Sequence, residues 1–344
     1  MQQITLIRPD DWHVHFRDGE ALKETVPHHA QRFGRAIVMP NLKPPITSVS
    51  LAKNYRQQIV AATPKDFDFN PLMTLYLTQM TSPEDIEQAK ESGIIYGVKF
   101  YPAGATTNSD AGVTDIFRLI PTLQTMAEVG LPLLIHAEVT DPAVDVFDRE
   151  KIFLESVIKP LLQKVPDLTV VLEHVTTKEM ADFVIDAGDQ VAATVTPQHL
   201  LYTRNDIFKG GIHPHLYCLP ILKREQHRER LREIVKSGHK RFFLGTDSAP
   251  HSQSAKESSC GCAGIFSAPC AIEIYAEIFE LLGALDKLEG FSSCYGADFY
   301  GLPRNKTQIT LIKKPWAVPE SYPLDSKNRI IPLKASETLH WQLT

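Results

Sequence analysis

Eight short apolar runs alternate with longer amphipathic segments, and this alternation limits the chain to a few folds. The runs cover residues 11–15, 36–40, 71–77, 95–101, 131–137, 168–174, 191–196 and 241–247. Nearly continuous apolar runs of this length are typical of parallel strands buried on both faces. Helices are predicted between them, for example over residues 83–92, 113–129, 147–164 and 224–237. The pattern predicts an α/β fold: a closed (β/α)8 TIM-like barrel with short N- and C-terminal extensions.

A doubly wound open sheet is the alternative architecture. No Gly-x-Gly-x-x-Gly follows the first predicted strand, so nothing in the sequence favours a dinucleotide-binding fold. The chain has 344 residues, of which 43% are hydrophobic, and this is enough for one barrel with a sizeable core. No linker or change in composition divides the chain. We therefore expect a single barrel domain over residues 1–344.

Three segments interrupt the alternation: residues 197–223, residues 248–269 and the tail 302–344, which contains five prolines. The tail also repeats a piece of the N-terminus, because residues 3–7 and 308–312 both read Gln-Ile-Thr-Leu-Ile. One five-residue echo does not make a repeat protein. Our hypothesis is that the two stretches pair in a small β layer that joins the chain ends.

Charge and composition argue against several classes of partner. The formal net charge is −5 and no basic run of five or more residues occurs, so no nucleic-acid partner is expected. No apolar stretch is long enough for a bilayer, and the N-terminus lacks the apolar core of a secretion signal. We expect a cytoplasmic protein without a membrane partner. Five cysteines in so long a chain argue against a disulfide framework. The spacing of Cys260 and Cys262 favours free thiols over half of a thiolate zinc site.

Six side chains able to take part in a metal site fall on predicted strands, most of them near the C-terminal end. They are His13, His15, Lys99, His136, His174 and Asp247. His13 and His15 are two residues apart on one strand, so they point to the same face. The C-terminal strand ends of a (β/α)8 barrel meet at one mouth. A lone histidine in an apolar run is more often a core residue, but that explanation would have to hold for every member of the set. Imidazoles and a carboxylate are ligands that zinc favours.

The flanking motifs carry a family resemblance. They are Asp11-Trp-His-Val-His-Phe-Arg-Asp18, Met39-Pro-Asn-Leu-Lys-Pro-Pro45, Gly97-Val-Lys-Phe-Tyr-Pro-Ala-Gly-Ala-Thr-Thr-Asn108, Leu172-Glu-His174 and Gly245-Thr-Asp-Ser-Ala-Pro-His251. In order and spacing the chain resembles the amidohydrolase superfamily and, within it, the bacterial single-enzyme class of dihydroorotases. The resemblance runs from about residue 8 to residue 300.

The resemblance implies a centre of two zinc ions per chain. One zinc takes His13, His15 and Asp247, and the other takes His136 and His174. Lys99, modified by CO2 to N6-carboxylysine, bridges them as a carbamate. The implied activity is the reversible cyclisation of N-carbamoyl-L-aspartate to L-dihydroorotate in pyrimidine synthesis, by a metal-bridging hydroxide. Asp247 is implied as the catalytic proton shuttle.

Substrate contacts follow from the same resemblance. Arg17, Asn41 and His251 would bind the substrate carboxylate, and the loop residues Thr106 and Thr107 would close over it. His136, Leu219 and Ala263 complete the implied contacts. Arg17 has independent support, since a cation beside a metal cluster is costly unless an anion joins it. Asn41 could equally be a surface polar group, and residues 104–110 a plain turn rather than a lid.

Two other functions stay open at this point. Another cyclic-amide hydrolase, such as a hydantoinase, would use the same metals with a different carboxylate site. A non-catalytic scaffold barrel would be expected to have lost ligands. The resemblance suggests a homodimer with a small-molecule substrate as its only other partner. His213-Pro-His215 copies the ligand spacing but is expected in a loop, and His28 and His29 are expected to be a solvated pair on the first helix.

Overall fold

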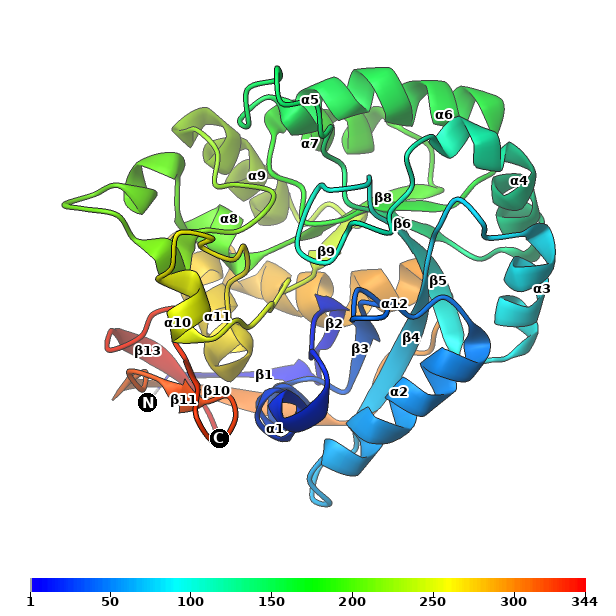
Figure 1. The fold of residues 1–344 in the computed structure, drawn as a ribbon. Helices are drawn as coiled ribbons and strands as arrows, with labels where there is room; N and C mark the ends of the chain where they lie inside the picture. Colours follow the sequence, from blue (N-terminus) through cyan, green and yellow to red (C-terminus); the bar gives the residue numbers. More distant parts are fainter. Residues whose placement is uncertain (1) are drawn as a thin grey trace.

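A parallel sheet of eight strands forms the centre of the molecule. The computed structural model describes residues 2–344, and its eight-stranded sheet runs in sequence order from β2 to β9 (Figure 1). The strands are β2 (Asp10–Val14), β3 (Arg35–Val38), β4 (Asn70–Tyr76), β5 (Ile95–Phe100), β6 (Leu133–Ile135), β7 (Val170–Leu172), β8 (Val191–Val195) and β9 (Phe242–Leu244). All eight predicted strands are present, although β6, β7 and β9 are shorter than the apolar runs that predicted them.

The sheet closes on itself between its first and last strands. Val14 and Ser248 form a parallel bridge, and the amide of His15 donates to the carbonyl of Ser248 at 3.0 Å. The amide of Asp247 donates to the carbonyl of His13 at 2.9 Å. The predicted (β/α) barrel is therefore confirmed, and the open-sheet alternative is wrong. Barrel closure places the segments after β2 and β9 side by side.

Helices lie between successive strands in the sequence and surround the barrel. They include α1 (Leu22–Arg32), α2 (Val49–Ala62), α3 (Pro83–Glu91), α4 (Ile120–Val129), α5 (Arg149–Phe153), α6 (Lys159–Lys164), α7 (Lys178–Asp186), α9 (Glu225–Ser237) and α11 (Ala271–Leu281). The helix predicted over 83–92 begins with a capping box, in which the Ser82 hydroxyl accepts from the amide of Asp85 and the Asp85 carboxylate accepts from that of Ser82. The helix predicted over 147–164 contains a π-helical segment, Leu154–Ile158, between α5 and α6. Among residues 2–344, no helix has the length and apolar character needed to cross a membrane.

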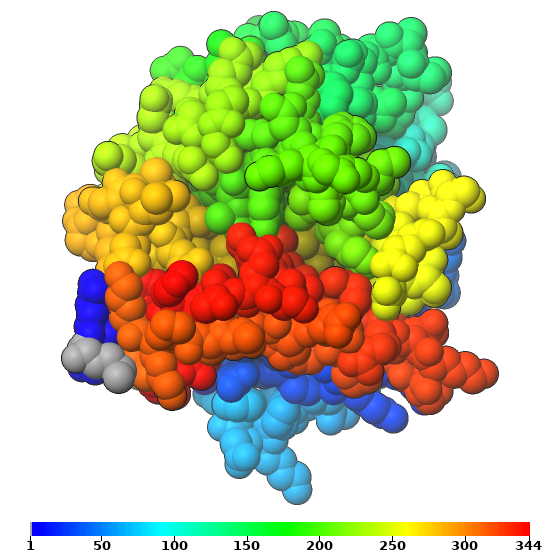
Figure 2. All heavy atoms as spheres, turned by 90° about the vertical axis from the view of Figure 1, so that its left-hand side faces the viewer, coloured from blue at the N-terminus to red at the C-terminus, as the bar shows by residue number. Residues whose placement is uncertain are grey.

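A second, antiparallel sheet joins the two ends of the chain. It contains β1 (Gln3–Ile7), β10 (Gln308–Ala317) and β13 (Thr338–Leu343), with β10 in the middle. Gln3 pairs with Ile312 and Ile7 pairs with Gln308, so the two copies of the repeated pentapeptide lie against each other. This confirms the hypothesis drawn from the echo. The C-terminal residues form a continuous band across one side of the molecule (Figure 2).

One end of the barrel interior is filled by apolar side chains. A buried cluster there includes Trp12, Ile37, Leu72, Leu134 and Phe243, and the ring of Trp12 stacks on Tyr300 at a centroid distance of 4.6 Å. Side chains that fill a barrel in this way make a packed core rather than a pore. The polar side chains of the barrel interior lie at the opposite end, where the strands end.

Candidate active site

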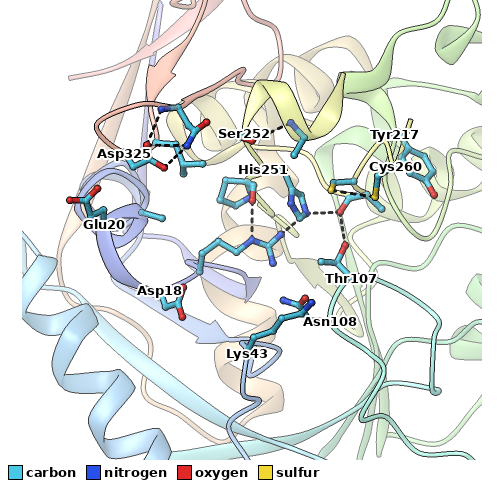
Figure 3. A pocket seen from close by; sticks show the side chains of 18 of the residues that line it. Asp18, Glu20, Lys43, Thr107, Asn108, Tyr217, His251, Ser252, Cys260 and Asp325 are labelled. Carbon is cyan, nitrogen blue, oxygen red and sulfur yellow. Dashed lines mark hydrogen bonds between the residues drawn. The ribbon is translucent and has the colours of Figure 1, made fainter. Parts of the chain in front are cut away.

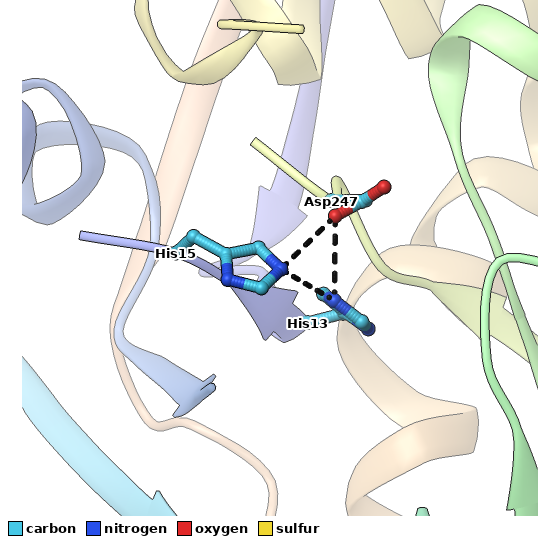
Figure 4. Close-up of side chains that lie close together, drawn as sticks. All are labelled: His13, His15 and Asp247. Carbon is cyan, nitrogen blue, oxygen red and sulfur yellow. Dashed lines mark hydrogen bonds and ion pairs between the residues drawn. The ribbon is translucent and has the colours of Figure 1, made fainter. Parts of the chain in front are cut away.

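Three of the predicted metal ligands meet at the mouth of the barrel. His13 is the fourth residue of β2, and His15 follows the end of that strand. Nε2 of His13 and Nε2 of His15 lie 3.2 Å apart, and each lies 3.3 Å from Oδ1 of Asp247 (Figure 4). All three side chains are almost fully buried. The alternation of a β-strand aims both imidazoles inward, and barrel closure brings Asp247 to them.

The backbone turns sharply at two of the ligands. Asp247 lies three residues beyond β9 with φ of 45°, and His174 lies two residues beyond β7 with φ of 43°. Non-glycine residues seldom adopt this left-handed conformation, and it is often found at functional sites. The amide of His174 donates to the hydroxyl of Thr194 at 2.7 Å, which holds this turn in place. Both side chains consequently point across the mouth.

Lys99 lies in the barrel interior with none of its side chain exposed, as predicted from its place in β5. Its Nζ contacts the carboxylate of Glu173 and lies 4.8 Å from the ring centroid of Tyr101. Glu173 also lies 3.1 Å from Nδ1 of His13. Burial lowers the pKa of Lys99 well below its ordinary value, which favours a neutral, nucleophilic amine. Glu173 is a site residue that the sequence analysis did not single out, although it stands within the Leu172-Glu-His174 motif.

His136 and His174 form the opposite side of the cluster. Their ring centroids are 4.8 Å apart, and the ring of His174 lies 5.0 Å from that of His13. Nε2 of His136 lies 2.8 Å from Oε2 of Glu138, a buried carboxylate that the sequence analysis also missed. A carboxylate that accepts from one imidazole nitrogen fixes the ring and leaves the other nitrogen for a metal.

Burial keeps three histidines of this site, His13, His15 and His174, neutral. It lowers the pKa of His15 to about 4 and lowers the pKa of His13 and His174 as well. Burial alone would raise the pKa of Asp247, but the close contacts of its carboxylate with His13 and His15 hold it well below its usual range. Neutral imidazoles beside an ionised carboxylate are the protonation states that bind a cation.

The donor set fits a metal centre. Ligand atoms of His13, His15 and Asp247 all lie within 4.8 Å of one another, and so do those of His13, Glu173 and His174. Nδ1 of His174 is buried without a hydrogen-bond partner among the described residues. Buried polar atoms are rarely left unpaired, so this nitrogen indicates a missing ligand. Five of the six residues of the predicted cluster, all except Lys99, line one small cavity.

Arg17 lies beside this cluster at the start of the outer mouth. Its Nε donates to the carbonyl of Pro250 at 2.9 Å, and its Nη2 lies 2.9 Å from Nε2 of His251. Burial, followed by the nearby Arg17, lowers the pKa of His251 to about 2, so its ring is neutral. Nε2 of His251 also lies 3.0 Å from the carbonyl of Ala263. Nε2 of His251 can accept from Arg17 or donate to that carbonyl, but not both at once. In either case Arg17 has no carboxylate partner within 4.0 Å among residues 2–344.

Asn41 connects a predicted metal ligand to the loop after β5. Its Oδ1 lies 2.7 Å from Nδ1 of His15, and its Nδ2 donates to the carbonyl of Thr107 at 3.0 Å. Thr107 in turn donates from its hydroxyl to the carbonyl of Ala263 at 3.4 Å. Asn41 is 2% exposed, so it is not the surface polar group considered as its alternative. The loop is docked over the cluster in this arrangement.

Two connected spaces mark the route to the cluster. An inner cavity of about 20 Å³ is bounded by the four histidines and Asp247 together with Arg17, Asn41, Tyr101, Thr106, Thr107, Leu219, Ala249, Ala263 and Gly264. An outer pocket of about 890 Å³ lies beyond it and shares Arg17, Thr107, Leu219 and Ala263 (Figure 3). Every substrate contact implied by the resemblance lines one or both spaces. The inner cavity holds about one water molecule, so a larger ligand needs the loop to move outward.

Two expectations about other histidines have different outcomes. His213 and His215 lie in the loop region after α8 (Pro197–Leu201), bonded to Lys209 and Glu257, and neither lines the two spaces. The prediction that His28 and His29 form a solvated pair on the first helix is wrong. His29 is fully buried, with Nε2 3.0 Å from Oδ2 of Asp11, while His28 is half-buried. Neighbouring residues on a helix point about 100° apart, so one can face the core while the next does not.

Asp11 itself ties the barrel closed beneath the ligands. Its carboxylate accepts from the amide of His13 at 3.1 Å and from the amide of Thr246 at 2.8 Å, and it also accepts from the Thr246 hydroxyl. These bonds join β2 to the segment after β9 next to two metal-ligand candidates. The sequence analysis quoted Asp11 as part of a motif but gave it no role.

Comparisons of sequence and of structure with known proteins all indicate the same family. A model of the Amidohydrolase family matches residues 4–331. A dihydroorotase of Picosynechococcus sp. is 58% identical over 342 residues, which are 99% of either chain. The crystal structure of a Campylobacter jejuni dihydroorotase superposes with a TM-score of 0.92 at 37% identity and covers 99% of this chain and 97% of its own.

Two further structures separate near from distant relatives. A Saccharomyces cerevisiae dihydroorotase in complex with 5-fluoroorotic acid gives a TM-score of 0.91 at 33% identity, over 100% of this chain and 99% of that chain. An Arthrobacter aurescens L-hydantoinase gives 0.79 at 15% identity, over 99% of this chain and 83% of that chain. At that identity the hydantoinase shows a shared fold and nothing more.

Proposed function

Because the chain belongs to the amidohydrolase family and, within it, to the dihydroorotases, we propose that it interconverts N-carbamoyl-L-aspartate and L-dihydroorotate. This reaction closes or opens a cyclic amide in pyrimidine (UMP) synthesis. The observation that carries the proposal is Arg17, a cation with no anionic partner among residues 2–344, placed beside a cluster of neutral imidazoles and one carboxylate. A ring substrate with its own carboxylate supplies the missing anion.

The cluster would hold two zinc ions. His13, His15 and Asp247 would bind one, and His136 and His174 the other, with Lys99 bridging both as a carbamate formed with CO2. An ammonium at Lys99 would repel both cations, whereas a carbamate is anionic and offers two oxygens. When bound, the zinc ions would lower the pKa of a coordinated water from 15.7 to about 7 and polarise the substrate carbonyl. Glu138 would orient His136 from behind through their hydrogen bond.

Asp247 is the proposed proton shuttle. Its carboxylate is ionised, lies at the mouth of the barrel and lines the inner cavity. In the opening direction Oδ1 or Oδ2 would take the proton of the attacking water. The same oxygen would then give that proton to the ring nitrogen as it leaves.

The remaining residues would bind and enclose the substrate. The Arg17 guanidinium would pair with the substrate carboxylate, with Asn41 and His251 beside it. His136, Leu219 and Ala263 would contact the ring from the wall of the inner cavity. Thr106 and Thr107 would close over it as part of a lid and exclude water. The small inner cavity supports this role for the loop, since it admits little more than a water until residues 104–110 move.

The experiment that tests the function compares two ring substrates. The full chain, loaded with zinc and bicarbonate, should open L-dihydroorotate and leave hydantoin, which lacks the carboxylate, largely unreacted. Arg17→Gln should abolish this preference by weakening dihydroorotate turnover, while zinc content stays unchanged. Equal turnover of both substrates would favour a hydantoinase-type enzyme, and turnover of neither with two zinc ions bound would favour a scaffold.

We also propose that the enzyme works as a homodimer in the cytoplasm. The five cysteines are all free thiols, which suits a reducing compartment. Light scattering should give about twice the chain mass of 38.6 kDa. A monomer of full activity would contradict the dimer.

A further inference from the structure

Two thiols lie together at the rim of the outer pocket. Cys260 is exposed and Cys262 half-buried, whereas the other three cysteines, Cys218, Cys270 and Cys294, are buried. The sulfur atoms of Cys260 and Cys262 are 3.9 Å apart (Figure 3). Gly261 between them has φ of +66°, a left-handed conformation that glycine adopts without the strain another residue would incur. The pair therefore needs to close by only about 2 Å to reach the length of a disulfide bond.

The residue after this pair belongs to the proposed substrate wall. The carbonyl of Ala263 accepts from the Thr107 hydroxyl at 3.4 Å and lies 3.0 Å from Nε2 of His251. Ala263 thus touches both the lid and the carboxylate-binding group. Because Ala263 directly follows Cys262, a shift of the backbone at residues 260–262 also moves the Ala263 carbonyl.

The backbone just beyond Ala263 is fixed. Lys256 is 3% exposed, and its Nζ donates at 2.7 Å both to the carbonyl of Gly264 and to the carbonyl of Tyr217. A Cβ atom at Gly264 would meet the carbonyl oxygen of Ala249 at 2.4 Å, so the chain is tightly packed at that point. Movement at Cys260 and Cys262 is therefore taken up by Ala263 and not by Gly264.

We propose that Cys260 and Cys262 form a reversible redox switch, in which a disulfide between them undocks Thr107 from Ala263 and lowers turnover. The inference rests on the proposed function, because it assigns a regulation to the same site. The oxidant is a low-molecular-weight disulfide. The thiolate of the exposed Cys260 attacks it, forms a mixed disulfide and releases one thiol. The thiolate of Cys262 then attacks the Cys260 sulfur, closes the protein disulfide and releases the second thiol.

The order of attack follows from the surroundings of the two thiols. Cys260 is open to a bulky disulfide, whereas burial raises the pKa of Cys262. Cys262 reacts second, when the sulfur it attacks is already beside it. The net step oxidises two protein thiols and reduces one disulfide to two thiols, so atoms and electrons balance.

The test treats the zinc-loaded full chain with oxidised glutathione, removes the reagent and measures three properties. The intact mass should fall by about two hydrogen masses, and peptide mapping should find Cys260 and Cys262 joined by a disulfide within one peptide. Amide hydrogen exchange of residues 104–112 should become faster. Turnover of L-dihydroorotate should fall several-fold relative to the same sample after dithiothreitol.

Matched variants separate the steps, each compared with its own reduced form. Cys262→Ser should keep glutathione on Cys260 and form no disulfide, and Cys260→Ser should form neither product. Cys294→Ser, which removes a buried thiol, should respond like the unaltered chain. A glutathione adduct without an internal disulfide in the unaltered chain would overturn the proposal, as would a disulfide that changes neither exchange nor turnover. Faster exchange on oxidation of an enzyme inactive even when reduced would uphold the switch and overturn the proposed function.

Discussion

Asn41 places its side-chain oxygen 2.7 Å from Nδ1 of His15 while its amide nitrogen holds the carbonyl of Thr107 at 3.0 Å. One buried amide thus orients a proposed metal ligand and docks the proposed lid. The acceptor oxygen keeps the proton of His15 on Nδ1, so that Nε2 is free for a metal. Loop docking and ligand orientation therefore meet at a single residue.

Asn41→Ala removes both interactions. We expect zinc affinity or activity to fall about 10- to 100-fold, the usual effect of losing a group that orients a ligand. Asn41→Asp is the matched variant, because a carboxylate still accepts from His15 but cannot donate to Thr107. It should retain zinc and lose mainly substrate affinity, as measured by metal analysis and KM. If both variants bind zinc and substrate normally, Asn41 has neither role.

Asp247→Asn tests the proton shuttle. The amide keeps an oxygen that binds metal weakly but cannot carry a proton. Zinc content should be partly retained, and turnover should fall about 10²- to 10⁴-fold. Activity within a few-fold of the unaltered chain would rule out proton transfer by Asp247.

The double variant Thr106→Ala, Thr107→Ala tests the lid. If each hydroxyl makes one hydrogen bond to the substrate worth about 1 kcal/mol, loss of both should lower kcat/KM about 30-fold. Zinc content should not change, because neither side chain lies among the proposed ligands. Thr114→Ala, on the exposed arm of the same loop, is the control and should behave like the unaltered chain. Loss of zinc in the double variant would make this loop part of the frame of the metal site.

The reaction itself predicts a pH dependence. Dihydroorotate carries one carboxylate and carbamoyl aspartate carries two, so ring opening releases a proton near neutrality. Above the carboxyl pKa, each pH unit should shift the equilibrium about tenfold toward the open form, or about 1.4 kcal/mol. Acid should favour ring closure. The ratio of the two compounds at equilibrium, measured between pH 6 and pH 8 with this enzyme as catalyst, checks the assignment, and a flat ratio would refute it.

The barrel, and the gathering of the candidate ligands at its mouth, could be predicted because both follow a regular pattern in the sequence. Buried parallel strands are almost wholly apolar, so His13, Lys99 and Asp247 stand out at or near their ends. The pairing of residues 3–7 with 308–312 could be inferred from the repeated pentapeptide. The supporting contacts could not be predicted in the same way. Glu173 contacts His13 and Lys99 from another strand, and Asp11 bonds to Thr246 across the closure of the barrel, so barrel closure rather than spacing fixes these partners. Glu138 lies only two residues from its partner His136, but nothing in the spacing marks it as a partner of that ring.

His29 illustrates a second limit. An adjacent pair of histidines on an amphipathic helix gives no sign of which one faces inward, and its partner Asp11 lies eighteen positions earlier in the chain. The turns after β7 and β9 were equally hidden. Their left-handed conformations at His174 and Asp247 occur at residues other than glycine, so no glycine marked them.

Lys99 carries the central claim, because only a modified lysine can bridge two cations from this position. Lys99→Ala should abolish activity and weaken the second zinc site, and a short carboxylic acid added with zinc should restore a small part of the activity. The most direct measurement is a ¹³C spectrum of the zinc-loaded chain prepared with labelled bicarbonate. We predict a carbamate signal that is absent from the Lys99→Ala variant. A fully active enzyme with two zinc ions and no such signal would contradict the mechanism.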